Sequence, residues 1–476
     1  MKALTHPILA AAMFFCAATG EGLAGEKEAQ ALLDAIADMS GAPGLSAAVS
    51  QNGIMIWAGQ SGFADLERKK PVTQTTRFRI ASVSKLLTAA LTLKLSEKGL
   101  LNLDEDIRTY VPDWPDHDGG VITLRQLAAH TSGIAHYGAG DRGTPFNEDD
   151  TLNDSLAIYA HKPLLFAPGK AYNYSSYGYA LMGAAIENAA GSSFEEALSV
   201  NLIEPLSLRR TSIEDISNLP EEASRLYRQG GATLTPNDQR AVLGATGVLS
   251  TPGDLVRFAD AYMRGDIISS ELVAQSLTPA ILNNGAPVDA GRFKVGFGWR
   301  IGENWETETV FHHAGLTPGA RSILTVNASR KLSAALLSNA SWTSRIETTG
   351  ELIATAAAEN PDRETCPTGE WRYEGIFASD PDAYPETPNA EGSLGIVLYE
   401  DVCRMTLAPQ GELAAWLAQL RNDATEMTAV MVAERPTGAV FAVATPWGAF
   451  PLYFSETALA LKGDFAGRTV DLSLHR

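Results

Sequence analysis

The alternation of apolar and polar positions predicts a helix followed by a β-hairpin near the start of the chain. Residues 26–41 place apolar side chains at helical spacing and end in a glycine, a common helix terminator. Residues 43–65 alternate on both sides of Asn52-Gly53, the dipeptide most typical of a two-residue hairpin turn. A second helix is expected over residues 82–99, a run of Leu and Ala that also ends in a glycine.

Strand patterns return in the later part of the chain, after a region of short helices and Gly-, Pro- and Asp-rich loops. Three strands and one helix are predicted there: residues 293–301, 319–327, 332–340 and 344–360. Strands and a helix at both ends of one segment can form a single sheet. We therefore expect residues 25–360 to form an α/β (α+β) unit, an antiparallel β-sheet flanked by helices, with a helical lobe inserted between them.

The last part of the chain has a different pattern. Residues 361–369 have the composition of a linker. Beyond them lie short β-rich runs such as SLGIVLY, GAVFAVA and WGAFPLYF, interrupted by one helical stretch at residues 411–420. We interpret residues 366–476 as a separate, mostly β C-terminal domain.

Residues 1–24 have the order of a secretory signal peptide: Lys2, a short apolar run and then small residues. A spanning helix is the rival, but it needs about 20 apolar residues, and this run is shorter and broken by Pro7. Cys16 suggests a lipid anchor, but the bulky Phe15 before it disfavours one. We expect a secreted or periplasmic protein with no integral membrane segment after cleavage.

Composition narrows the partners and the compartment. The 476 residues carry a net charge of −19, with 45% hydrophobic and 20% charged residues, which is typical of a soluble globular protein without a nucleic-acid or anionic-membrane partner. Removal of the signal would leave two cysteines, Cys366 and Cys403. In an oxidising compartment they are a candidate disulfide, and two buried thiols are the alternative.

Candidate chemistry begins at Ser82, at the start of the second predicted helix. The free N–H groups of a helix N-terminus favour negative charge, and Lys85 lies on the same face one turn later. A lysine in apolar surroundings loses its proton more readily and can accept one from a hydroxyl. The alternative is that Ser82 only caps the helix and Lys85 is a solvated charge, since S-x-x-K is common by chance.

Two further segments favour the catalytic interpretation of Ser82 and Lys85, because together with S-x-x-K they make a set of three short motifs. They are Ser82-Val83-Ser84-Lys85, Tyr174-Ser175-Ser176 and His313-Ala314-Gly315. With their flanks, they resemble the motifs of serine hydrolases of the class C β-lactamase and D-Ala-D-Ala carboxypeptidase (penicillin-binding protein) family. The subgroup that looks most similar is that of the mitochondrial β-lactamase-like serine peptidases, and the resemblance covers about residues 25 to 350.

The resemblance implies a role for each motif. Ser82 would be the nucleophile that forms an acyl-enzyme, and Lys85 a base for it. Tyr174 would relay the proton to the leaving group. The backbone N–H groups of Ser82 and Leu316 would form the oxyanion hole, and His313 would line the opposite wall and contact substrate.

Two departures from the family pattern affect the expected substrate. Ser176 stands where the family often has Asn, and His313 begins the motif that ends at Gly315, where the family often has Lys. These three positions would contact substrate. A neutral imidazole binds a carboxylate poorly at pH 7, so we expect weak β-lactamase activity. Arg321 could supply the missing charge, or it could be a solvated strand residue.

Other motifs are weaker. His312 and His313 are adjacent and would point to opposite faces of a strand, with no third ligand at suitable spacing. Neither H-E-x-x-H nor G-x-S-x-G occurs, and no glycine-rich stretch has the strand-to-helix setting of a nucleotide site. We therefore predict no metal and no cofactor. His130 and His136 are expected to be structural.

The sequence thus predicts an exported serine hydrolase that cleaves an amide or an ester through a Ser82 acyl-enzyme. A peptide or peptidoglycan-like fragment is the first substrate hypothesis and a small ester the second. A true β-lactamase is the alternative enzyme. A catalytically silent binding or regulatory protein on the same scaffold is the alternative from another class, and the presence of Ser82, Lys85 and Tyr174 together argues against it.

Overall fold

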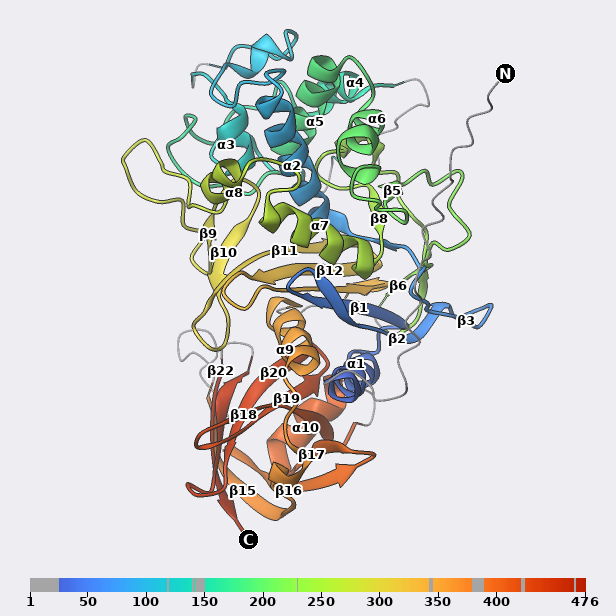
Figure 1. Ribbon diagram of the computed structural model, residues 1–476, viewed down its shortest axis with the longest axis vertical. Coiled ribbons are helices and arrows are strands. Elements are labelled where there is room, and N and C mark those ends of the chain that lie inside the picture. The colour runs from blue at the N-terminus through green and yellow to red at the C-terminus, as the bar shows by residue number, and fades with distance from the viewer. Residues whose placement is uncertain are drawn as a thin grey trace, which may run out of the picture.

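The computed structural model describes residues 25–476, except 118–119, 139–140, 142–149, 229, 342–345, 379–388, 421–423 and 466–467 (Figure 1). The predicted signal peptide, residues 1–24, lies outside the described residues. No helix in the described ranges is both long enough and apolar enough to cross a bilayer.

An eight-stranded antiparallel sheet forms the middle of the molecule, in the order β3-β2-β1-β13-β12-β11-β10-β9. Its strands are β1 (Gly44–Gln51), β2 (Ile54–Asp65), β3 (Lys70–Pro71), β9 (Lys294–Val295), β10 (Arg300–Glu303), β11 (Thr309–Thr317), β12 (Ala320–Asn327) and β13 (Leu332–Ser338). The β1–β2 hairpin turns at Asn52 and Gly53, both in the left-handed region, as a two-residue turn requires. The fold-class prediction is confirmed.

Helices cover both faces of this sheet. The terminal helices α1 (Glu26–Ser40) and α9 (Ile346–Ala358) pack on one face, and α7 (Pro252–Arg264) packs on the other, against β1 and β13 (Figure 1). The helix α1 ends, as predicted, at Gly41 in the left-handed conformation. The sheet is therefore buried on both sides, and the two faces have different neighbours.

The helical lobe lies above the α7 face (Figure 1). Its helices are α2 (Ser84–Glu97), α3 (Leu124–Ala128), α4 (Leu152–Ser155), α5 (Ser176–Ala190), α6 (Phe194–Leu198) and α8 (Ser270–Ser276), with single turns η1 (Ala81–Val83), η2 (Ile107–Thr109), η4 (Leu156–Ile158), η5 (Ser199–Ile203) and η6 (Arg240–Val242). Short strands accompany them: β4 (Phe78–Arg79), β5 (Ser212–Ile213) and β8 (Val248–Ser250) in one small sheet, and β6 (Leu226–Arg228), β7 (Thr233–Leu234) and β14 (Ala340–Ser341) in another.

Two predicted elements differ from the structure. The helix expected from residue 82 begins with the 3-10 turn η1, and the α-helix itself starts at Ser84. The strand expected over residues 293–301 is split into β9 and β10. The break falls at Gly298, which is in the left-handed region and so close to α2 that a Cβ there would lie 2.6 Å from the Cβ of Ala89.

The C-terminal part is a closed barrel of eight strands, which confirms the mostly β prediction (Figure 1). The strands are β15 (Gly369–Ala378), β16 (Asn389–Tyr399), β17 (Val402–Pro409), β18 (Met427–Arg435), β19 (Gly438–Thr445), β20 (Gly448–Ser455), β21 (Ala460–Phe465) and β22 (Arg468–His475), with α10 (Gly411–Leu420) between β17 and β18. The turn η7 (Arg363–Thr365) lies in the predicted linker. Cys366 and Cys403 form a disulfide that ties this linker to β17.

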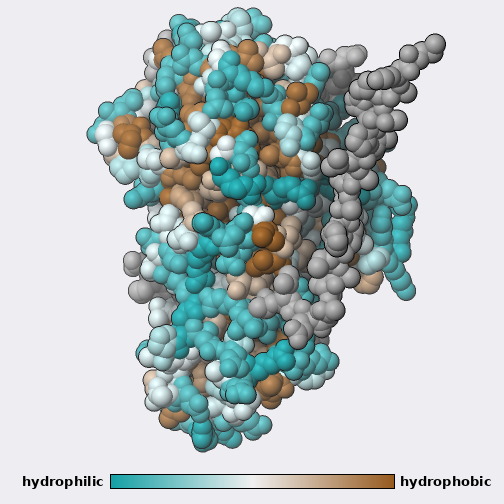
Figure 2. Space-filling model, in the orientation of Figure 1, coloured by the Kyte–Doolittle hydropathy of each residue, from teal (hydrophilic) through white to brown (hydrophobic). Residues whose placement is uncertain are grey.

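The barrel packs directly on α1 and α9, and one hydrophobic core runs from the sheet through these helices into the barrel. Ile36 of α1 and Leu352 of α9 are fully buried in it. At its margin, Arg435 of β18 forms ion pairs with Glu306 and Glu359. On the face shown in Figure 2, hydrophobic residues show more often between the helices of the lobe than over the barrel. Apolar side chains from all eight barrel strands belong to the shared core.

Candidate active site

Ser82 lies in the turn η1, between β4 and α2, and its side chain is half-buried. The preceding residue, Ala81, has a φ of 47°, which is uncommon for a residue with a Cβ. Neighbouring strands hold this turn: the Ile80 N–H donates to Val248 O (3.0 Å), and Ser322 Oγ donates to Ile80 O (2.6 Å). The nucleophile candidate therefore sits on a fixed, strained turn at the start of a helix.

Lys85 is fully buried, and its Nζ contacts three oxygen atoms. They are Ser82 Oγ at 3.3 Å, Ser176 Oγ at 3.1 Å and Ala245 O at 2.9 Å. Burial lowers the pKa of Lys85, against the opposing effect of Tyr174. Ala245 O can only accept from this amine, whereas the hydroxyls of Ser82 and Ser176 can accept from it, or donate to it once it is neutral.

Tyr174 lies over this amine. Its ring centroid is 5.1 Å from Lys85 Nζ, and its hydroxyl forms hydrogen bonds with Ser82 and Lys85. Burial alone would raise the pKa of Tyr174, but the positive charges of Lys85 and Arg300 outweigh it and lower that pKa. The structure thus brings together the three residues predicted to be catalytic, and the phenol hydroxyl can exchange protons with both Ser82 and Lys85.

Two histidines hold the loop that carries Tyr174. The N–H of Ser175 donates to His130 Nδ1 (3.1 Å), and the N–H of Ser176 donates to His136 Nδ1 (3.0 Å). Burial, then the nearby Lys85, keeps the pKa of His130 well below its usual value, so its Nδ1 stays free to accept. Both imidazoles position the start of α5, in agreement with the structural role predicted for them.

The third motif lies on β11, which passes close to the Ser82 turn. A Cβ on Gly315 would lie 2.3 Å from Ile80 O, so only glycine allows this approach. His313 is 1% exposed, and its ring centroid is 6.3 Å from that of Tyr174. Burial, followed by the charge of Arg300, keeps the pKa of His313 well below its usual value. It is therefore neutral at pH 7, as the sequence analysis assumed.

The backbone of Leu316 is oriented by the β11–β12 hairpin. Thr317 and Ala320 pair across its two-residue turn, and Leu316 pairs with Arg321. The pair that closes a two-residue turn is hydrogen-bonded, and the next pair is not, so the Leu316 N–H points away from β12. Pairing with β10 ends at His312, so this edge of β11 is not covered by β10 at Leu316.

Arg300 is the positive charge that sequence reasoning missed. Its guanidinium lies 5.7 Å from the ring centroid of Tyr174 and 4.6 Å from that of Phe293, and 3.8 Å from the Glu347 carboxylate. Arg321 pairs with Leu316, and its charge interacts with those of Glu347 and Arg300. The arginine whose charge acts on Tyr174 is Arg300.

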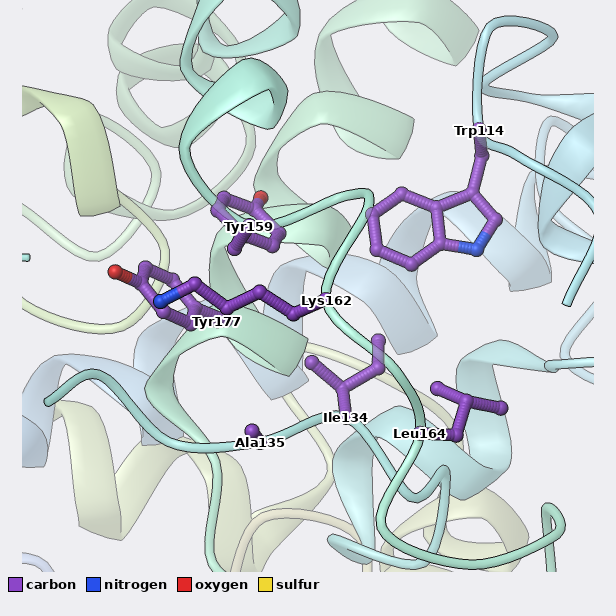
Figure 3. A pocket seen from close by; sticks show the side chains of 7 residues that line it. All are labelled: Trp114, Ile134, Ala135, Tyr159, Lys162, Leu164 and Tyr177. Atoms are coloured by element: carbon purple, nitrogen blue, oxygen red, sulfur yellow. The ribbon is translucent and has the colours of Figure 1, made fainter.

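Two pockets lie outside this group. One, of about 200 Å³, is a crevice in the lobe lined by Trp114, Ile134, Ala135, Tyr159, Lys162, Leu164 and Tyr177 (Figure 3). Tyr159 and Tyr177 stack there with ring centroids 4.2 Å apart, and the Lys162 ammonium lies 5.4 Å from the Tyr177 centroid. The other, of about 280 Å³, lies between the sheet and α9, and Thr325 and Glu351 line it.

In the part of the chain that the structure describes, no three His, Cys, Asp or Glu side chains gather to hold a metal.

This fold and this grouping of serine, lysine and tyrosine match the class of protein suggested by the three motifs. The Beta-lactamase family model matches residues 29–358, well over half of the chain, and the chain belongs to this family. Its members are serine hydrolases. The family resemblance seen in the sequence is confirmed.

The chain is 26% identical over 299 residues to penicillin-binding protein 4* of Bacillus subtilis (strain 168), covering 58% of this chain and 63% of that protein. It is 28% identical over 305 residues to the human serine beta-lactamase-like protein LACTB, mitochondrial, covering 49% and 56%. It thus spans roughly three fifths of these curated relatives. The octameric penicillin-binding protein homologue from Pyrococcus abyssi shares the fold over 94% of this chain and 99% of its own, with a TM-score of 0.59 and 21% identity.

Proposed function

We propose that this protein is an exported serine hydrolase that cleaves an amide or ester bond through an acyl-enzyme on Ser82. The observation that carries the proposal is the position of Lys85. Its amine is fully buried, has a lowered pKa and lies 3.3 Å from Ser82 Oγ. A solvated surface lysine, the alternative reading of S-x-x-K, would have none of these properties.

The first half-reaction follows from these contacts. Lys85 accepts the proton of the Ser82 hydroxyl, and Ser82 Oγ attacks the substrate carbonyl carbon. The N–H groups of Ser82 and Leu316 stabilise the oxyanion, a contribution typically worth about 10²- to 10³-fold per donor. As the bond to the leaving group breaks, Tyr174 donates a proton to that group and regains one from Lys85.

The second half-reaction reverses these transfers. Water attacks the acyl carbon and gives a proton to Tyr174 while Tyr174 passes its own proton to Lys85. Lys85 then returns a proton to Ser82 Oγ as the acid leaves. Ser176 Oγ and Ala245 O hold the amine throughout. No step requires a metal or a cofactor.

Arg300 supports a substrate that bears a carboxylate. A guanidinium is always charged and binds carboxylates in a fixed geometry. Its place beside Tyr174 supplies the charge that the neutral His313 lacks. A peptide or peptidoglycan-like fragment with a free carboxylate is therefore the first substrate class, ahead of a neutral ester. A β-lactam is the alternative, because it presents a carboxylate too.

The Cys366–Cys403 disulfide supports export, since structural disulfides persist in oxidising compartments. The signal-like residues 1–24 point to the same route. The proposed location is thus secreted or periplasmic.

The test uses a labelled fluorophosphonate and a labelled penicillin on the full chain, with intact mass and peptide mapping. The wild type should gain one adduct, on Ser82, and Ser82→Ala none. Loss of the nucleophile typically costs on the order of 10⁶-fold in turnover. A wild type that stays unlabelled, or a Ser82→Ala variant that labels equally, would exclude the mechanism and favour a silent binding protein. Nitrocefin, p-nitrophenyl esters and D- and L-aminoacyl amides then separate the substrate classes.

A further inference from the structure

A segment formed by residues 237–247, which we call the brace, contacts the site from the side of the lobe. At its start, the Arg79 guanidinium donates to the side-chain oxygen and the carbonyl of Asn237, at 3.2 and 3.1 Å. Near its end, Ala245 O accepts from Lys85 Nζ at 2.9 Å. The brace therefore touches both the strand that leads into the nucleophile turn and the lysine that follows it.

Gln239 makes a third connection from the middle of the brace. Its side chain is buried, its Nε2 donates to Thr317 Oγ1 (3.0 Å), and its Oε1 accepts from Thr246 Oγ1 (2.6 Å). Both ends of the amide are used, so its orientation is fixed. Thr317 directly follows Leu316, and Thr246 directly follows Ala245. One side chain thus links the residue next to the oxyanion donor with the residue next to the carbonyl that holds Lys85.

The end of β11 needs such a link. Its pairing with β10 ends at His312, so the five residues from His313 to Thr317 are paired on one edge only, with β12. Segments with fewer backbone hydrogen bonds open locally at a lower free energy. An oxyanion donor is effective only within about 2.7–3.1 Å of the developing charge. A displacement of about 1 Å can cost about 10²-fold in rate.

We propose that Gln239 is a positioning residue that keeps the Leu316 N–H in register with Ser82 and Lys85. The inference rests on the proposed function, because it assigns Gln239 an effect on acylation through Leu316. It acts by holding Thr317 against the brace, and it does not itself contact the reacting atoms.

The experiment measures the second-order rate of Ser82 labelling by a fluorophosphonate, and kcat and KM for a p-nitrophenyl ester. Gln239→Ala and Thr317→Val each remove the same hydrogen bond, and each should lower the labelling rate and kcat by about 10- to 100-fold, with KM nearly unchanged. The double variant should lose no more than Gln239→Ala alone, because Gln239→Ala already removes the bond to Thr317 together with the bond to Thr246. Thr317→Ser keeps the hydroxyl and should recover most of the rate.

Gln275→Ala is the matched control, because Gln275 is an exposed glutamine that also forms a side-chain hydrogen bond. Gln239→Leu, which is close to glutamine in volume but cannot hydrogen-bond to Thr317, decides the question if Gln239→Ala fails to fold. Normal labelling in Gln239→Leu and Thr317→Val would overturn the inference while the function stands. Additive losses in the double variant would also overturn it. An unlabelled wild type would instead reject the proposed function, and this inference with it.

Discussion

The two faces of the eight-stranded sheet each bury an ionisable side chain with a shifted pKa, and their surroundings differ. On the lobe side, burial lowers the pKa of Lys85, whose amine contacts three oxygens, one of them on Ser82. On the barrel side, burial and the neighbouring Glu347 raise the pKa of Glu351 to about 8. Glu351 lines a pocket with Thr325, between the sheet and α9.

A shifted pKa by itself does not identify a functional group. Shifted groups cluster at functional sites, but burial alone produces the same shift. Lys85 lies beside a half-exposed hydroxyl, a phenol and an arginine, so it can exchange a proton with a neighbouring group. Glu351 lies in the layer between the sheet and the barrel. Its raised pKa means that ionising this carboxyl destabilises the folded protein.

The largest expected effect is on the lobe face. Lys85→Met should lower the rate of Ser82 labelling and ester turnover by about 10³-fold, because the proton acceptor is lost. In the wild type, the rate should fall as the pH drops through the lowered pKa of Lys85, since the ammonium cannot accept a proton. Lys94→Met, on the same helix and partly exposed, is the control. A Lys85→Met variant that labels at the wild-type rate would remove Lys85 from the mechanism.

The next effect is on the opposite face and concerns stability. Glu351 is protonated in the folded protein up to about pH 8, whereas in the unfolded chain it ionises near pH 4.5. The penalty for burying it is therefore absent below pH 4.5, grows as the pH rises and is complete above pH 8. Glu351→Gln should raise the free energy of unfolding by about 3–4 kcal/mol more at pH 9 than at pH 5.

Urea unfolding at the two pH values measures this difference. Glu271→Gln, at an exposed glutamate on α8, is the control. An equal change at both pH values would mean that Glu351 ionises normally in the folded protein. Ser82 should be labelled at the same rate in Glu351→Gln and in the wild type. Equal rates would show that Glu351 does not influence the site on the other face.

A smaller effect is expected from removing the positive charge on the lobe face. Arg300→Ala should lower kcat/KM for a penicillin or another carboxylate-bearing substrate by about 10- to 100-fold, since a hydrogen bond to a charged group is typically worth about 1.5–3 kcal/mol. A neutral p-nitrophenyl ester should change far less. Arg321→Ala provides the comparison, and a larger loss there than in Arg300→Ala would reverse the assignment.

The smallest effect is expected at the margin of the barrel. Arg435→Met breaks the ion pairs with Glu306 and Glu359 but leaves the core intact. Partly exposed ion pairs contribute little, so the free energy of unfolding should fall by about 1 kcal/mol or less. Thermal unfolding measures the change, and the labelling rate of Ser82 should not move. A slower labelling rate would show that the barrel side influences the site.

Local patterns predicted most of the fold and the centre of the site. The Asn52-Gly53 hairpin and the helix ending at Gly41 follow from backbone preferences that the residues carry themselves. Ser82 and Lys85 could be paired from sequence because one helical turn separates them. The break before β10 was not predicted. It lies at Gly298, which packs against Ala89, and this contact joins segments that are distant in the sequence.

The missed parts of the site depend on tertiary contacts with no motif. Arg300 reaches Tyr174 only because β10 pairs with β11, and nothing in its own neighbourhood in the sequence marks it. Ala245 holds Lys85 through its carbonyl, a group that every residue has. Gln239 is recognisable only once Thr317 lies beside it. The Ser176 hydroxyl, predicted to contact substrate, also accepts a hydrogen bond from Lys85, a contact that no motif indicates.

The shared core of α1, α9 and the barrel has a consequence for how the chain matures. Strands β18 and β19, which pack on α1, are synthesised long after it. The apolar side of α1 therefore stays unprotected until these strands have been made. A nascent chain halted near residue 360 would expose the same surfaces of α1 and α9, which makes such a chain prone to aggregation.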